Sequence, residues 1–206
     1  MLFKINLGQE YLLVIFTLKI IKKNKKGGFI MDSLRLAEIY THSLDSFSLL
    51  NVLYTSDDLL IGISFNEEAQ ISAFNIIMQD AASHINYDST YISFYTNYVL
   101  EQCTNQTLMT YPYIDQLTDY IPSNEHSVAH WLNIAHDHQL IVTLLNIEAD
   151  TLLVGKISAL ISDTVMLLPF DFETFKFNTC EVIQIDDIDK ISIEVSYQRL
   201  LNYTTD

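Results

Sequence analysis

The sequence predicts a mainly β fold with short helices (α+β), arranged as two tandem small barrels that are each preceded by an amphipathic helix. Three observations predict it: a glycine-containing phrase occurs twice, apolar runs of strand length surround each copy, and a helix-like segment precedes each set. The phrases are Asp57–Gly62 (DDLLIG) and Asp150–Gly155 (DTLLVG), and their glycines lie 93 positions apart. Because Gly62 and Gly155 are the only glycines after residue 28, the pair indicates an internal duplication.

Residues 1–30 differ from the rest of the chain and are expected to be a translated leader outside the fold. They hold six of the eleven Lys and Arg residues. Their apolar run, residues 11–21, is about half of the ~20 residues needed to span a bilayer, and its basic cluster follows the run, unlike a secretory signal. Back-translation of Lys26–Met31 with AAA as the lysine codon and GGA as the first glycine codon contains AGGAGG, a ribosome-binding sequence, just before the ATG of Met31. Translation is therefore expected to start at Met31, with a short amphipathic surface anchor as the alternative.

A short amphipathic helix is expected at the start of each unit. Asp32–Asp45 aligns with Asn124–Asp137, and both segments begin with a residue type that caps helix N-termini. Apolar residues recur at helical spacing in both: Leu36, Ile39, Tyr40 and Leu44 in the first, and Val128, Trp131, Leu132 and Ala135 in the second.

About five short strands are expected after each helix. The paired runs are residues 47–54 with 140–147, 71–80 with 164–171, and Tyr91–Phe94 with Val182–Ile185, with the glycine phrases between the first two pairs. Curling so small a sheet into a barrel would remove its free edges. A glycine inside a strand marks a sharp bend or a close backbone approach, so Gly62 and Gly155 are expected to be equivalent structural positions.

The duplication divides the chain into units. Residues 31–104 are expected to form the first helix-plus-barrel unit, 105–122 a linker, and 123–206 the second unit. The linker is polar and aromatic rather than rich in Gly and Ser, so we expect it to pack between the units rather than act as a flexible tether.

Beyond residue 30 the chain is strongly acidic. Removing the six Lys residues and one Glu of residues 1–30 from totals of 11 basic and 26 acidic residues leaves 5 and 25, a net charge of −20 over 176 residues. Such a charge favours solubility and opposes binding to nucleic acid and to anionic membranes. Cys103 and Cys180 are the only cysteines and fall in different units, which indicates no disulfide framework and favours a reduced, cytoplasmic setting.

Four of the six histidines lie close together, at His126, His130, His136 and His138. The first two are four residues apart, which on a helix lets two imidazoles reach one metal ion. The zinc-peptidase pattern needs a Glu directly after the first histidine, but Ser127 stands there, and the first unit has no equivalent cluster. We interpret the four as a solvated helix face and only weak candidates for a metal site.

No motif for catalysis or for a cofactor is found. The chain contains neither a Gly-x-Ser-x-Gly elbow nor a glycine-rich phosphate loop. The sequence therefore predicts no catalytic residue and no cofactor.

A helix followed by five bent strands, with a glycine early in the second strand, resembles the Sm-like and SH3-like small barrels. The tandem arrangement looks like uncharacterised two-domain Sm-like proteins of Gram-positive bacteria. RNA-binding Sm proteins carry an Asp and an Asn after the second strand and an Arg-Gly pair near the fourth. This chain has Gln70–Ser72 and Ser162–Val165 near the first position, Gln184–Asp187 near the second, and no Arg-Gly pair. The resemblance implies the fold without implying RNA binding.

The sequence thus predicts a non-enzymatic, cytoplasmic protein-interaction or scaffold protein that acts through protein partners, self-association included. Direct binding to nucleic acid or to a membrane is not expected. Two alternatives stay open. One is an acidic nucleic-acid mimic that occupies the basic groove of a DNA- or RNA-binding protein, and the other is a metal-dependent enzyme that uses the histidines at 126–138.

Overall fold

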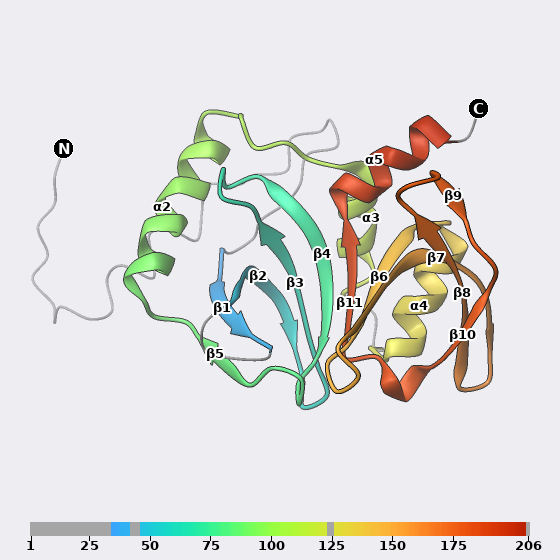
Figure 1. Cartoon of the computed structure of the whole chain (residues 1–206). Helices are drawn as coiled ribbons and strands as arrows, with labels where there is room; N and C mark the ends of the chain where they lie inside the picture. The colour runs from blue at the N-terminus through green and yellow to red at the C-terminus, as the bar shows by residue number, and fades with distance from the viewer. Residues whose placement is uncertain (1–33, 42–45, 123–125, 205–206) are drawn as a thin grey trace, which may run out of the picture. The chain divides into compact units, whose positions relative to one another are not determined.

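The computed structural model describes residues 34–41, 46–122 and 126–204, and Arg35–Asp206 forms one compact unit. The expected leader, residues 1–30, lies outside the described residues, as does the expected start at Met31. Within the compact unit all strand pairs are antiparallel and belong to one sheet, in the order β10-β8-β7-β6-β11-β4-β3-β2-β1-β5, with β9 paired to β8 (Figure 1). The mainly β, α+β class expected from the sequence is confirmed.

The elements follow the chain in two sets of strands separated by helices. The first set is β1 (Leu36–Tyr40), β2 (Ser48–Thr55), β3 (Leu59–Phe65), β4 (Ile71–Met78) and β5 (His84–Asn86). The helices α2 (Thr90–Thr104), α3 (Pro112–Asp119) and α4 (Val128–Asp137) come next. The second set is β6 (Ile141–Asn146), β7 (Thr151–Ile161), β8 (Thr164–Asp171), β9 (Lys176–Phe177), β10 (Glu181–Gln184), the 3₁₀ turn η2 (Ile185–Asp187) and β11 (Lys190–Glu194), followed by the helix α5 (Val195–Thr204).

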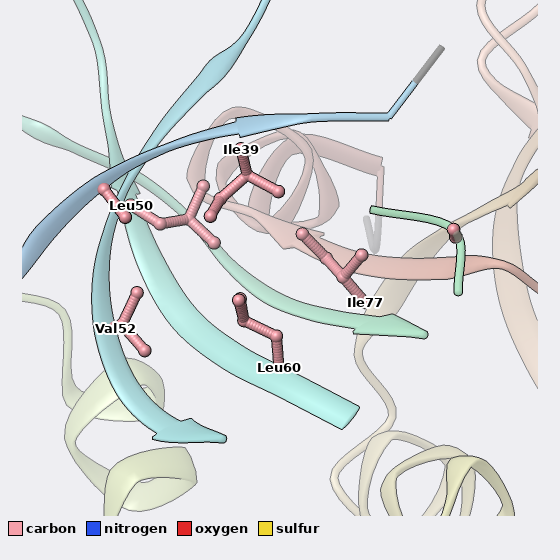
Figure 2. Close-up of a cluster of buried hydrophobic side chains, with 7 residues drawn as sticks. Ile39, Leu50, Val52, Leu60 and Ile77 are labelled. Carbon is pink, nitrogen blue, oxygen red and sulfur yellow. The ribbon is translucent and has the colours of Figure 1, made fainter. Parts of the chain in front are cut away.

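Two apolar layers hold the first set of strands, one on each face. On one face, Ile39, Leu50, Val52, Leu60 and Ile77 point toward one another from β1 to β4 (Figure 2). On the other face Phe74 packs against Trp131 of α4, with ring centroids 5.3 Å apart. Because successive side chains of a strand point to opposite faces, β4 serves both layers, and Phe74 and Trp131 are both fully buried.

The first expected helix, Asp32–Asp45, is wrong, because residues 36–40 form the strand β1. β1 pairs with β2 on one side and with β5 on the other, and four of its five residues are buried. A strand buried on both faces does not alternate between apolar and polar residues. The spacing of Leu36, Ile39 and Tyr40 therefore matches that of an amphipathic helix although the segment is a strand. The second expected helix is present as α4, although it begins at Val128, after the N-cap Ser127, rather than at Asn124.

The expected strand at Tyr91–Phe94 is also wrong, because these residues lie in the first turn of α2. The Ser89 hydroxyl accepts a hydrogen bond from the Ile92 backbone N–H (3.0 Å), and this cap starts the helix. Tyr, Ile and Phe favour strands by propensity, but the capped amphipathic helix prevails here. Residues 105–122, expected as a linker, contain α3, whose Ile114 and Leu117 are buried.

Two separate closed barrels are not observed, because the path of strand pairing is open and ends at β5 and β10. The last strand, β11, pairs with β4 at Ser192↔Asn75 and with β6 at Ser192↔Thr143. β11 thereby joins the two sets of strands. It pairs the backbone N–H and C=O groups at one edge of each set, as the closing of each set into a barrel would also do.

Gly62 and Gly155 occupy corresponding places in two three-stranded meanders, β2–β3–β4 and β6–β7–β8. Each lies on the middle strand and pairs with a valine of the preceding strand, Val52 or Val142. A Cβ added at Gly62 would lie 2.7 Å from the backbone oxygen of Asn51, and one at Gly155 would lie 2.3 Å from that of Leu168. Both glycines therefore permit a close backbone approach.

In the part of the chain that the structure describes, no helix combines the length and the apolar character needed to cross a membrane.

Candidate functional site

A groove of about 670 Å³ opens between the start of β2, the β3–β4 turn and the first turn of α2. Aromatic, acidic and serine side chains make up most of its lining. The lining residues are Phe47, Ser48, Leu49, Ser64, Phe65, Asn66, Glu67, Glu68, Ser72 and Tyr91. A hollow of this volume is in the range of small-molecule and peptide sites.

The β3–β4 turn presents the two carboxylates of the groove. The Asn66 side-chain oxygen accepts hydrogen bonds from the backbone N–H groups of Glu68 (3.0 Å) and Gln70 (2.9 Å). Gln70 in turn accepts a hydrogen bond from the backbone N–H of Met109 (2.8 Å). Hydrogen bonds within the turn and with Met109 therefore fix its conformation. Glu67 and Glu68 are exposed at its tip.

The aromatic wall consists of Phe47 and Tyr91, backed by Tyr95. The rings of Phe47 and Tyr91 meet edge to face with centroids 5.0 Å apart, and Tyr91 stacks on Tyr95 at 4.5 Å. The Tyr95 hydroxyl donates a hydrogen bond to the backbone oxygen of Glu67 (3.2 Å), which ties α2 to the turn. Phe47 and Tyr91 keep 37% and 40% of their surface exposed, so their outer sides are free to receive a ligand.

Burial, followed by the hydrogen bond with Tyr95 and the charges of Tyr95, Glu67 and Glu38, raises the pKa of Tyr91 to about 12. The phenol is therefore neutral at physiological pH. It can act as a hydrogen-bond donor and as a π surface.

The groove has no positive charge in its lining, and its neighbourhood in the sequence has almost none. No Lys or Arg occurs between Arg35 and Lys156. The Arg35 guanidinium lies over the ring of Tyr87, 4.5 Å from its centroid, and not among the lining residues. The site therefore combines aromatic faces with two carboxylates and has no Lys or Arg in its lining, a combination that attracts cations.

A buried carboxylate holds the base of α2 beside the groove. Glu38, 3% exposed, accepts hydrogen bonds from the Tyr40 hydroxyl (3.1 Å), the Asn86 amide (3.0 Å) and the Ser89 hydroxyl (2.5 Å). These donors come from β1, β5 and the cap of α2. Glu38 therefore fixes the position from which Tyr91 reaches the groove.

The histidines expected as weak metal candidates fall into two places. His126 precedes the N-cap of α4 and its ring lies 4.1 Å from that of Tyr54, so His126 and His130 do not share a helical face. At the other end of α4, His136 contacts the carboxylate of Asp137 (3.2 Å) and His138 contacts the hydroxyl of Tyr120 (2.9 Å). Among the described residues no group of three or more His, Cys, Asp or Glu side chains is arranged to hold a metal ion.

The sequence did not point to the groove, because its residues come from four separate stretches between positions 47 and 91. The signal that was present is the Glu67–Glu68 pair at a turn within a stretch that lacks Lys and Arg. The partner aromatics Phe47 and Tyr91 had been placed in expected strands, so their meeting was not predictable from local pattern.

Comparison of the chain with protein-family models, with curated proteins and with solved structures finds no match in any of the three.

Proposed function

We propose that this chain is a non-enzymatic protein-interaction module that binds a basic, extended segment of a partner protein in the groove beside α2. The observation that carries the proposal is the lining itself: two exposed aromatic rings and two exposed carboxylates with no Lys or Arg among them. A lysine or arginine side chain would place its charge over Phe47 or Tyr91 and within reach of Glu67 and Glu68.

The energetics favour a weak, salt-sensitive complex. A cation over an exposed aromatic ring contributes about 0.5–1 kcal/mol, and an exposed ion pair contributes a similar amount. Several such contacts along one segment are needed for micromolar affinity, which corresponds to about 8 kcal/mol. The partner segment is therefore expected to carry more than one basic residue.

We also propose that the tandem Sm-like organisation describes the curvature of the two sets of strands. In each set the last strand in chain order pairs with the first: β5 with β1, and β11 with β6. The matching positions of Gly62 and Gly155 support the same relationship. In this proposal the sheet is the scaffold and the groove at its first half is the binding site.

The test is a fluorescence-anisotropy titration of the full chain with a short labelled peptide that alternates Arg and Ser, near 0.15 M salt. The control peptide carries citrulline in place of arginine and so lacks the charge. We expect saturable binding of the arginine peptide and binding at least about tenfold weaker for the citrulline peptide, since each 1.4 kcal/mol is a factor of ten. Equal affinity for the two peptides would contradict the proposal.

A matched pair of variants locates the site. Glu67→Gln/Glu68→Gln removes the two carboxylates of the β3–β4 turn, whereas Glu148→Gln/Asp150→Asn removes two exposed carboxylates from the β6–β7 turn. We expect about a tenfold loss of peptide affinity in the first double variant and less than about a twofold loss in the second. Equal losses would indicate a general charge effect, as a nucleic-acid mimic has, rather than binding in the groove.

A further inference from the structure

A small polar pocket of about 140 Å³ lies on the sheet where β3, β4 and β11 meet. It is lined by Ser64, Ser72, Ala73, Asn75, Lys190, Ser192 and Glu194, and it shares Ser64 and Ser72 with the groove. Lys190, Ser192 and Glu194 are alternate residues of β11, so their side chains point to one face of the sheet. The pocket is thus built on the central strand that joins the two sets.

Hydrogen bonds fix the floor of the pocket. The Ser192 hydroxyl donates to the side-chain oxygen of Asn75 (2.8 Å), and the Asn75 amide donates to the Ser64 hydroxyl (3.0 Å). The hydroxyls of Ser64 and Ser72 are 2.9 Å apart. Asn75 and Ser192 are both almost completely buried, so this network is preorganised before any ligand arrives.

The two charged groups of the pocket do not pair with each other. The Lys190 ammonium makes no hydrogen bond or ion pair within 4.0 Å with any residue that the structure describes. The Glu194 carboxylate accepts a hydrogen bond from the Thr143 hydroxyl (3.2 Å). Burial lowers the pKa of Lys190, while the negative charge of Glu194 opposes that shift. The two groups therefore interact electrostatically without forming an ion pair.

We propose that this pocket binds a small zwitterion of the free amino-acid class, with its carboxylate on Lys190 and its ammonium group on Glu194. A ligand with a single charge would leave one of the two half-buried charged side chains without a compensating charge, which costs free energy. The size agrees: a water molecule occupies about 30 Å³ of liquid, so the pocket admits a molecule of only a few heavy atoms.

The test is isothermal titration calorimetry of the full chain with glycine, L-alanine, L-serine and γ-aminobutyrate as zwitterionic probes. Acetate and methylammonium, at matched ionic strength, serve as the two half-probes. We expect saturable binding of at least one zwitterion and affinity at least tenfold lower for both half-probes. Absence of saturable binding for all four zwitterions at millimolar concentrations would overturn the proposal, as would equal binding of acetate.

Variants assign the binding to the pocket. Lys190→Met and Glu194→Gln should each lower the affinity for the bound zwitterion at least tenfold, while Lys156→Met on β7, which removes a lysine outside the pocket, should leave it unchanged. Circular dichroism checks that each variant is folded, and Glu194→Gln carries the test by itself if Lys190→Met does not fold. Glu67→Gln/Glu68→Gln should keep amino-acid binding, so this inference can fail or hold independently of the peptide proposal. Unchanged affinity of Glu194→Gln for the zwitterion would refute its binding in this pocket.

Discussion

At the scale of single residues, Gly62 and Gly155 control how closely neighbouring strands approach. The requirement is steric, since the obstructing atoms are backbone oxygens that cannot rotate away, and the shorter approach is at Gly155. The glycine phrase was therefore the most informative signal in the sequence, and its physical meaning lies in packing rather than in chemistry.

We predict that Gly155→Ala lowers the free energy of unfolding by more than the ~1 kcal/mol of ordinary propensity effects, and that Gly62→Ala lowers it by less than Gly155→Ala does. The reason is the difference between the two close approaches, 2.3 Å and 2.7 Å. Urea denaturation of both variants measures this, with the exposed Glu181→Ala on β10 as the control. Stability equal to wild type in Gly155→Ala would show that β8 can move aside.

Lys190 is the second residue with a stability cost, because its side chain is half-buried and its ammonium has no partner among the described residues. In the absence of ligand we predict that Lys190→Met raises the free energy of unfolding at pH 7, because burial disfavours the charged form of Lys190 and lowers its pKa. Chemical denaturation of the two proteins side by side checks this. A less stable variant would mean that the ammonium is satisfied in solution.

The pH dependence of that difference has a definite sign. The folded-state pKa of Lys190 lies below its ordinary value of 10.5, so between the two values the unfolded state binds more protons and wild-type stability rises with pH. The advantage of Lys190→Met should therefore shrink as the pH rises toward 10.5. Tyrosines, whose raised pKa values act in the opposite direction, are common to both proteins and cancel in the comparison.

At the scale of elements, the sequence predicted those with a strong local signal and missed those that depend on distant partners. The apolar runs around Gly62 and Gly155 are the strands β2–β4 and β6–β8, and the stripe with Trp131 is α4. The strand β1 was not predicted because it is buried on both faces and lacks the two-residue alternation of apolar and polar side chains. The helix α2 was not predicted because its aromatic residues favour strands. The groove was missed because it forms only after α2 folds back on the β3–β4 turn.

Glu38 is the contact that connects three of these elements. We predict that Glu38→Ala lowers the free energy of unfolding by at least ~2 kcal/mol, because hydrogen bonds to a charged group contribute about 1.5–3 kcal/mol each. Amide hydrogen exchange should accelerate most in α2, whose cap residue Ser89 loses its partner. Acceleration spread evenly over the sheet would show that Glu38 does not specifically anchor α2.

At the scale of the whole unit Arg35–Asp206, β11 makes one sheet from the two sets of strands. Its pattern, Lys-Ile-Ser-Ile-Glu, indicates a strand, but nothing local specifies that its neighbours are β4 and β6. The Lys190 pocket depends on this continuity, since it takes residues from β3, β4 and β11. The packing of Phe74 on Trp131 adds a second connection between the sets.

The most direct test of this account is the cooperativity of unfolding in Gly155→Ala, followed in each set of strands separately. Hydrogen exchange of β6 and β7 amides reports on the second set, and that of β2 and β3 amides reports on the first. If β11 joins the sets into one cooperative sheet, the substitution shifts both probes to the same lower urea midpoint. A shift of the β6 and β7 amides alone, with β2 and β3 as stable as in wild type, would show two independent units and contradict the account.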